Sequence, residues 1–285
     1  MNPKPTWLKM RHKPNSQFDE TISILKSLEL NTVCAEADCP NCAECFSDKT
    51  ATFMILGTNC TRDCRFCNVS FGMPTAVDNS EPERISKAVK MLGLKYVVIT
   101  SVTRDDLPDG GASHFVSIIQ SLKKEAPNTE IEVLIPDFGG NLSALKQIAD
   151  AKPSVIGHNV ETVPELYTHV RPQADYQRSL NILREIKALN PKIYSKTGIM
   201  LGLGETTEQV ELLFDDLCGI GCDFLTIGQY LAPSTLHFPV IEYITPERFE
   251  EYGNSARKRG MSFVKSAPLV RSSYRATEAF TNVQG

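Results

Sequence analysis

Seven of the nine cysteines lie within residues 34–67, and three of them form a compact pattern. Cys60, Cys64 and Cys67 have the spacing C-x3-C-x2-C, which places three thiolates on one short loop. Cysteine thiolates hold iron–sulfur clusters, and a cube of this kind has four irons. Three protein ligands leave one iron open, and an open coordination position is typical of a catalytic metal site. The loop therefore predicts a reactive cluster.

The cysteines that precede this loop leave a second interpretation open. Cys39 and Cys42 form one C-x2-C pair and Cys64 and Cys67 form another, 21 residues further on. Two such pairs are typical of a structural zinc site, although this separation slightly exceeds the usual 15 to 20 residues. The zinc interpretation gives no role to three further thiols, which are Cys34, Cys45 and Cys60.

Composition excludes several other classes of protein. The cysteine number is odd and no secretory signal follows Met1, so we expect no disulfide framework and a cytoplasmic location. A net charge of -4 argues against a nucleic-acid partner. Apolar runs are far shorter than the ~20 residues of a membrane span, so no membrane segment is expected. Cys218 and Cys222 are interpreted as small buried apolar residues.

Other catalytic signatures are missing from the sequence. The five histidines form no H-x-x-x-H or comparable pair, which leaves a histidine-based metal site unsupported. There is no G-x-S-x-G, no P-loop and no G-x-G-x-x-G after a strand. The sequence thus gives no support to hydrolase, nucleotidase or dinucleotide-binding functions.

Short β-branched runs alternate with helical patterns from residue 51 onward. The runs are mostly apolar without alternation, which predicts parallel strands buried beneath helices, in either a doubly wound sheet or a barrel. A barrel of about 250 residues fits within the 285 residues of the chain. The predicted strands are 51–56, 96–101, 131–135, 155–160, 193–201 and 224–229. The predicted helices are 83–92, 113–125, 142–149, 176–189, 207–220 and 246–259.

The first 33 residues are predicted to form an extension. Trp7, the single tryptophan, lies in a basic arm with Lys4, Lys9, Arg11 and Lys13. Apolar residues at helical spacing predict a helix over 16–30. The alternative for the arm is a solvated segment without a partner.

Several motifs together carry a resemblance to a known family. The C-x3-C-x-F-C loop resembles the signature of the radical S-adenosylmethionine superfamily, and the spacing of Cys34, Cys39 and Cys45 narrows the resemblance to the lipoyl synthases. Further matching segments are RDDLPDGGA at 104–112, HNVETV at 158–163, VRP at 170–172, KTGIMLGLGE at 196–205, GQYL at 228–231 and RSSY at 271–274. Cys42 has no cluster role in this pattern.

The resemblance implies a fold and a domain order. The fold is an α/β protein with a partial (β/α)6 TIM-type barrel, in agreement with six predicted strands. Residues 1–50 would form an extension that carries the first cysteine triplet, and residues 51–260 the barrel. Residues 261–285 would form a C-terminal segment that carries the R-S-S-Y sequence.

The resemblance also implies two [4Fe-4S] clusters. Cys60, Cys64 and Cys67 would hold the cluster that binds and cleaves S-adenosylmethionine. Cys34, Cys39 and Cys45 would hold an auxiliary cluster that donates sulfur, with a serine as its fourth ligand. We place that ligand at Ser273 in preference to Ser272. Serine oxygen is a harder and weaker ligand for iron than thiolate, which suits a cluster that is opened during the reaction.

In the family, the reaction is the insertion of two sulfur atoms at C6 and C8 of a protein-bound octanoyl group. The resemblance therefore implies, as partners, octanoylated lipoyl domains of 2-oxoacid dehydrogenases or the glycine-cleavage H protein. Ferredoxin or flavodoxin is the expected reductant. The basic arm with Trp7 is a candidate for docking acidic carrier domains.

Asn159 and Glu161 lie at the end of the strand predicted at 155–160, and Arg171 follows shortly after, so all three would lie at the mouth of a barrel. Asn159, Glu161 and Arg171 are candidates for hydrogen bonds to the ribose hydroxyls or the methionine carboxylate of S-adenosylmethionine, since arginine suits a bidentate carboxylate contact. The alternative for Arg171 is a surface ion pair. Two other functions remain open for the chain: another radical enzyme, biotin-synthase-like or methylthiolating, and a zinc-stabilised binding module.

Overall fold

The computed structural model describes residues 4–9 and 14–284, which fall into two compact units. Of the described residues, 14–62 and 68–156 form the N-terminal unit, and 4–9, 63–67 and 157–284 form the C-terminal unit. Arg11 and Lys13 of the basic arm lie outside the described residues. Among the described residues, no helix is long and apolar enough to cross a membrane.

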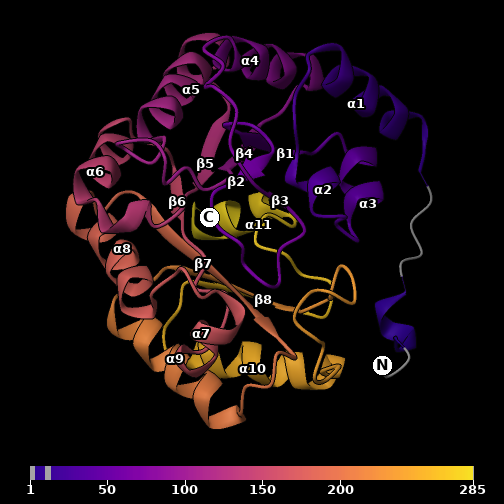
Figure 1. Cartoon of the computed structure of the whole chain (residues 1–285), viewed down its shortest axis with the longest axis vertical. Helices are drawn as coiled ribbons and strands as arrows, with labels where there is room; N and C mark the ends of the chain where they lie inside the picture. The colour runs from indigo at the N-terminus through magenta and orange to yellow at the C-terminus, as the bar shows by residue number, and fades with distance from the viewer. Residues whose placement is uncertain (1–3, 10–13, 285) are drawn as a thin grey trace. The chain divides into compact units, whose positions relative to one another are not determined.

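The N-terminal unit is built on strands in the order β1-β4-β5-β6. β1 is parallel to β4, with Thr52 opposite Val98, and β4 is parallel to β5, with Tyr96 opposite Glu130. Figure 1 shows α4, α5 and α6 on the outer side of these strands. The elements are α1 (Ser16–Ser27), α2 (Val33–Glu36), α3 (Cys42–Ser47), β1 (Thr52–Ile55), β2 (Asn59–Cys60), β3 (Ser70–Phe71), α4 (Glu81–Leu92), β4 (Tyr96–Ser101), α5 (Ala112–Glu125), β5 (Glu130–Leu134), η2 (Phe138–Gly140), α6 (Leu142–Asp150) and β6 (Val155–Gly157).

The C-terminal unit is built on the neighbouring strands β7, β8 and β9. β8 is parallel to both neighbours: Phe224 lies opposite Lys196 of β7 and opposite Phe263 of β9. Every residue of β8 is buried, as expected for a strand that is covered on both faces. The elements are η1 (Thr6–Leu8), η3 (Pro164–Leu166), α7 (Tyr167–Val170), α8 (Tyr176–Leu189), β7 (Tyr194–Leu201), α9 (Thr207–Gly219), β8 (Phe224–Gln229), α10 (Pro246–Lys258), β9 (Phe263–Ser266) and α11 (Ala276–Gln284).

Local sequence explains where several helices begin and end. α9 begins at a capping box, in which Thr206 accepts the N–H of Gln209 and the Gln209 side chain accepts the N–H of Thr206. α10 begins with Pro246. Proline lacks an N–H, but this costs nothing in the first turn of a helix, where an N–H would have no intrahelical acceptor. α4 ends at Gly93, which has a φ of 68°, a conformation that glycine adopts without strain.

The predicted secondary structure needs two corrections. All six predicted strands are present with shifted ends, but the two-residue strands β2 and β3 were not predicted, and neither was β9. It is only four residues long and carries Lys265, so its pattern is too short and polar to stand out. No helix or strand was predicted between residues 31 and 50, but Cys34, Cys42 and Cys45 lie there on the short helices α2 and α3. Thr32 caps α2 by accepting the N–H of Ala35.

Candidate active site

The chain leaves β1 for the cysteine loop through a strained residue. Leu56 has a φ of 68°, which costs an L-residue about 1–2 kcal/mol. Its N–H donates to the buried Glu81 carboxylate at 3.1 Å, which also lies 2.7 Å from Nε2 of His114. Its carbonyl accepts a hydrogen bond from Arg104 at 3.1 Å. A Cβ at Gly111 would lie 2.4 Å from the Leu56 side chain, so this position requires glycine.

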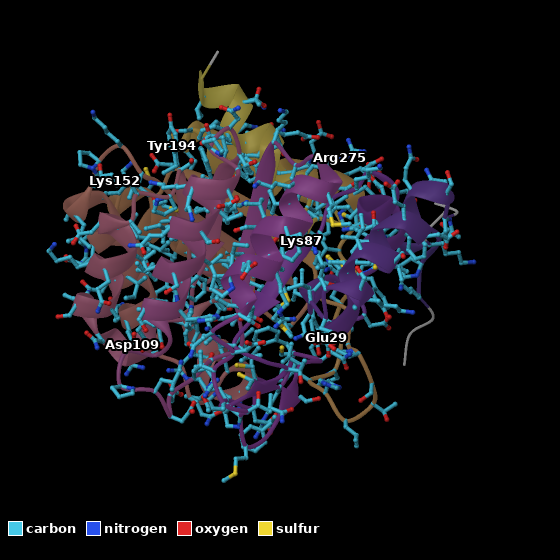
Figure 2. The ribbon with its side chains drawn as sticks, turned by 90° about the horizontal axis from the view of Figure 1, so that it is seen from above. Glu29, Lys87, Asp109, Lys152, Tyr194 and Arg275 are labelled. Atoms are coloured by element: carbon cyan, nitrogen blue, oxygen red, sulfur yellow. The ribbon has the colours of Figure 1, made fainter. Side chains whose placement is uncertain are left out.

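The R-D-D-L-P-D-G-G-A segment therefore acts largely by fixing the backbone conformation at Leu56, just before the cysteine loop. Arg104, which holds the Leu56 carbonyl, is itself held by a bidentate contact with Asp106 at 2.8 Å. Asp109, labelled in Figure 2, accepts the N–H groups of Gly111 and Ser113 at the start of α5. No signal in a single sequence separates these structural contacts from contacts with a substrate.

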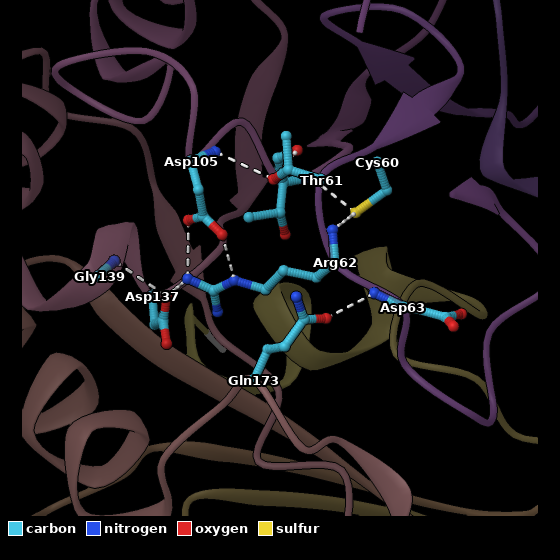
Figure 3. A network of polar contacts seen from close by, with 9 residues as sticks. Cys60, Thr61, Arg62, Asp63, Asp105, Asp137, Gly139 and Gln173 are labelled. Atoms are coloured by element: carbon cyan, nitrogen blue, oxygen red, sulfur yellow. Dashed lines mark hydrogen bonds and ion pairs between the residues drawn. The ribbon is translucent and has the colours of Figure 1, made fainter. Parts of the chain in front are cut away.

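The first cysteine of the loop receives two backbone hydrogen bonds. Sγ of Cys60 lies 3.4 Å from the N–H of Arg62 and 3.3 Å from the N–H of Thr103, which follows β4 (Figure 3). The Thr61 N–H and hydroxyl both donate to the Thr103 carbonyl and join the two segments. N–H donors directed at sulfur stabilise the negative charge of a thiolate, which is the form that binds iron.

The rest of the loop, residues 63–67, packs within the C-terminal unit. The Arg65 N–H donates to the Val170 carbonyl at 2.9 Å, and the Arg65 carbonyl accepts from the N–H of Phe238 at 2.8 Å. Nε2 of His237 lies 3.1 Å from the Cys67 carbonyl. Phe66, the aromatic residue before the last cysteine, packs against an apolar cluster that contains Val170, Leu203 and Tyr230. The aromatic residue of the motif is thus an apolar anchor for the loop.

The first cysteine triplet is assembled by α2, α3 and the turn between them. The Cys39 N–H donates to the Cys34 carbonyl at 3.0 Å, and the Cys42 N–H to the Cys39 carbonyl at 3.1 Å. Burial and the nearby Cys39 and Cys42 raise the pKa of Cys34 to about 12. Burial, then Cys34 and Cys39, raises the pKa of Cys45 to about 12. The structure therefore brings these four thiols together, Cys42 included.

The raised pKa values predict a slow reaction of these thiols with alkylating agents. Only the thiolate is nucleophilic, so at pH 8 Cys34 and Cys45 of the apoprotein stay protonated and unreactive. Cys218 is exposed, so its interpretation as a buried residue is wrong, whereas Cys222 is buried as expected. The exposed Cys218 serves as an internal reference. We expect iodoacetamide to modify the exposed Cys218 at least about tenfold faster than Cys34, because Cys34 is buried and each unit by which its pKa is raised lowers its thiolate fraction about tenfold. Peptide mass spectrometry over time measures both modification rates. Equal rates would contradict the raised pKa of Cys34.

The three residues after β6 lie together in the C-terminal unit. Arg171 is buried, so the alternative of a surface ion pair is wrong. Its Nη1 donates to the carbonyls of Asn159 and Val160, at 2.9 and 3.1 Å, and its guanidinium stacks on the Tyr167 ring at 5.2 Å. Arg171 thereby fixes the backbone that carries Asn159 and Glu161.

This strand end also carries polar atoms that the protein does not satisfy. Oδ1 of Asn159 and Oγ1 of Thr162 are buried with no hydrogen-bond partner among the described residues. Burial raises the pKa of the Glu161 carboxyl, while Arg171, Asn159 and Arg271 partly oppose the shift. Buried acceptors without partners are costly unless a ligand or water fills the role. Thr162, which was not singled out in the sequence, thus joins the candidate site, and these atoms fit a ligand that carries hydroxyl or amino donors.

The R-S-S-Y segment is fixed by a close approach of two backbones. The Ala267 N–H donates to the Ile227 carbonyl, and the Gln229 N–H donates to the Pro268 carbonyl, so residues 267–270 follow β8. A Cβ at Gly228 would lie 2.0 Å from the Val270 carbonyl oxygen. Ser272 and Ser273 lie in the turn that follows, both half-buried. Gly228 of the G-Q-Y-L segment is therefore the residue that permits this approach.

A Gly228→Ala variant is expected to lose stability and to displace the serine turn. The added methyl group overlaps the Val270 carbonyl oxygen, and overpacking of this kind costs about 1–3 kcal/mol or more. Gly219→Ala is the matched control, because its Cβ would meet nothing within 4 Å. Urea unfolding of the two apoproteins measures the difference. Equal midpoints would contradict the close approach.

The G-L-G-E segment is also structural. The Glu205 carboxylate accepts the N–H groups of Gly202 and Leu203 at 2.6 and 2.9 Å. A Cβ at Gly202 would lie 2.3 Å from both the Gln229 side chain and the Glu242 carbonyl oxygen. Gln229 is fully buried and satisfies four backbone groups at this strand end. Sequence reasoning singled out neither Gln229 nor Glu205 as a positioning residue.

The chemistry of the thiols fits an iron–sulfur cube. Among the described residues, no group of three His, Cys, Asp or Glu side chains is placed to hold one metal ion. A structural zinc needs all four ligands within about 2.0–2.3 Å of one point. The thiolates of a cube bind different irons, so their sulfur atoms stand further apart. The donor set of either triplet is therefore compatible with a cube.

Comparison with known proteins places this site in a class. The chain matches the radical SAM superfamily over residues 54–217, a range that begins in β1 and includes the C-x3-C-x2-C loop. SuiB of Streptococcus suis bound to S-adenosylmethionine has a TM-score of 0.60 at 15% identity, over 89% of this chain and 62% of that chain. Methylornithine synthase has a TM-score of 0.50 at 16% identity, over 88% and 85%. The fold and the cysteine loop are those of a radical S-adenosylmethionine enzyme, which confirms the predicted α/β partial-barrel class.

Relatives of higher sequence identity show which family of radical S-adenosylmethionine enzymes the chain belongs to. The lipoyl synthase of Caldicellulosiruptor saccharolyticus is 56% identical over 275 residues, 96% of each chain. That of Alkaliphilus metalliredigens is 54% identical over 276 residues, 97% of this chain and 95% of the relative. The chain belongs to the lipoyl synthase family and is a radical S-adenosylmethionine sulfurtransferase. The alternatives of a biotin-synthase-like or methylthiolating enzyme and of a zinc-stabilised module are thereby wrong.

Proposed function

We propose that this chain inserts two sulfur atoms, at C6 and C8, into an octanoyl group that is bound to a carrier protein. The observation that carries the proposal is the pair of separate cysteine triplets, one between the barrel strand β1 and α4 and one on α2, α3 and the turn between them. The 56% identity to a lipoyl synthase over nearly the whole chain supports it. Two clusters give a ligand role to six thiols and one serine, whereas a single metal site would leave several of these residues without a role.

The proposed ligands divide into two sets. Cys60, Cys64 and Cys67 hold one [4Fe-4S] cluster and leave one iron for S-adenosylmethionine. Cys34, Cys39, Cys45 and Ser273 hold the auxiliary cluster. When bound, these groups supply the one-electron chemistry and the inserted sulfur, while the protein contributes orientation and exclusion of side reactions. The division 1–50, 51–260 and 261–285 is proposed on the same basis.

The chain's own residues have positioning roles in this proposal. The N–H groups of Arg62 and Thr103 stabilise the charge on Cys60. Asn159 and Glu161 offer acceptors for ribose hydroxyls or for the amino group of S-adenosylmethionine. Nη1 of Arg171 already donates to two carbonyls. We therefore assign the contact with the methionine carboxylate of S-adenosylmethionine to the other nitrogens of this guanidinium. This cation also offsets the negative charge of Glu161.

The proposed partners follow from membership of the family. An octanoylated protein is the substrate, and we propose lipoyl domains of 2-oxoacid dehydrogenases or the glycine-cleavage H protein as carriers. Ferredoxin or flavodoxin is the proposed reductant. The half-exposed Trp7 stays a candidate for carrier docking. The cytoplasmic location and the absence of nucleic-acid and membrane partners stay predictions.

Iron and sulfide analysis tests the proposal first. Anaerobic reconstitution is expected to give about eight irons and about eight sulfides per chain, the content of two cubes. Cys218→Ser, which changes a thiol outside both triplets, serves as the control and keeps the full content. One or two zinc ions without sulfide would overturn the proposal.

A further inference from the structure

A buried arginine spans two acidic segments beside the cysteine loop. Arg62 donates to the Asp105 carboxylate through Nε at 2.7 Å and Nη2 at 2.8 Å, and Nη2 also lies 2.7 Å from Asp137 (Figure 3). Arg62 is 8% exposed and Asp137 only 1%. A buried carboxylate needs a directed partner, and the planar fork of arginine serves two carboxylates where a lysine ammonium lacks that geometry.

The backbone of this arginine contacts the first cysteine of the loop. Its N–H is one of the two donors to Cys60 Sγ, and the second donor is the N–H of Thr103. Asp105, which receives the Arg62 side chain, also donates its own N–H to the Thr61 hydroxyl at 3.0 Å. The side-chain network and the two sulfur-directed N–H groups therefore belong to one connected structure within the N-terminal unit.

Asp137 anchors this network to a separate element. It accepts the N–H of Gly139 at 3.0 Å and caps the short helix η2 after β5. Arg62 thus connects the loop after β1 with segments that follow β4 and β5. A contact across three consecutive strand ends restricts the loop more strongly than a hydrogen bond to a neighbour in sequence, because Asp105 and Asp137 lie in segments that directly follow the packed strands β4 and β5.

We propose that Arg62 is a positioning residue that, through Asp105 and Asp137, holds two N–H donors on the Cys60 sulfur and thereby sets the reduction potential of the cluster bound there. The inference rests on the proposed ligation by Cys60. Hydrogen bonds to cluster sulfurs help to set the potential. They stabilise the more negative, reduced cluster, so their loss makes reduction harder.

The test compares Arg62→Lys with the parent chain in a background that lacks the auxiliary ligands (Cys34→Ala, Cys39→Ala, Cys45→Ala). Lysine keeps the positive charge and removes the fork. We expect the equilibrium constant for one-electron reduction to fall about tenfold, which is 59 mV, in an anaerobic titration followed by electron paramagnetic resonance. Arg84→Lys is the matched control: this arginine of the same unit pairs with Asp78 and two carbonyls, and its replacement leaves the potential unchanged.

Asp137→Ala separates positioning from charge, because the two effects have opposite signs. Removal of a negative charge alone makes the cluster easier to reduce and raises the potential. Loss of the positioning contact lowers it. We expect a lower potential and a faster loss of iron to a chelator. A raised potential would overturn the positioning role.

The remaining outcomes are also decisive. If Arg62→Lys lowers the melting temperature of the apoprotein but leaves the potential unchanged, the network is merely structural and the inference fails. If a Cys60→Ala variant in the same background retains the full cluster, the proposed ligation by Cys60 fails instead. An unchanged potential in Arg62→Lys thus refutes the positioning role, and a full cluster in Cys60→Ala refutes the ligand role of Cys60.

Discussion

A Cys64→Ala variant is expected to lose reductive cleavage of S-adenosylmethionine. Cys64 is the central ligand of the C-x3-C-x2-C loop, and the neighbouring backbone groups hold positions 63–67 in one conformation. Without its thiolate, only two protein ligands remain for a cube. Changes around metal ligands typically cost about 10–100-fold in affinity or activity, and removal of a ligand itself is expected to exceed that range.

Liquid chromatography of 5′-deoxyadenosine after incubation with dithionite measures the loss. Cys218→Ala is the control, since its thiol is exposed and donates a hydrogen bond to the Arg259 carbonyl. This variant is expected to cleave S-adenosylmethionine at the parental rate. If Cys64→Ala retained that rate, the loop would not hold the reactive cluster.

Cys39→Ala is expected to separate the two halves of the reaction. Cleavage of S-adenosylmethionine continues, because the ligands of that cluster are intact, but no sulfur reaches the octanoyl chain. The iron content falls from about eight to about four per chain. This variant thus produces 5′-deoxyadenosine without a lipoyl product, which mass spectrometry of the carrier peptide detects.

Cys42 offers a matched control within the same group of thiols. Burial, together with the nearby Cys39 and Asp38, raises the pKa of Cys42 to about 11, so it shares the surroundings of the triplet. It has no ligand role in our assignment. Cys42→Ala therefore keeps both clusters and sulfur insertion. The opposite result, with Cys42→Ala inactive and Cys39→Ala active, would exchange the two assignments.

The chemistry was more predictable from the sequence than the geometry that supports it. Spacing alone indicated an open cluster, because three thiolates on a short loop leave one iron without a protein ligand. Buried strands were visible as continuous apolar runs. The strand β9 was not visible in the sequence, because its four residues include a lysine and are too few to show an apolar pattern.

The supporting contacts depend on residues that are distant in sequence. Arg62 and Asp137 are 75 positions apart, and each on its own resembles an ordinary surface charge. Gly228 is required because the Val270 carbonyl approaches it, which no local pattern reveals. The positive φ of Leu56 is likewise imposed by tertiary contacts and opposes the preference of leucine.

The most direct test of the account uses clusters reconstituted with sulfur-34 sulfide. The protein is incubated anaerobically with an octanoyl-lysine peptide from a lipoyl domain, S-adenosylmethionine and dithionite, and the oxidised product is analysed by mass spectrometry. The account predicts a peptide that has lost two hydrogens and gained two atoms of sulfur-34. An unmodified octanoyl peptide despite formation of 5′-deoxyadenosine, or a product with unlabelled sulfur, would contradict the account.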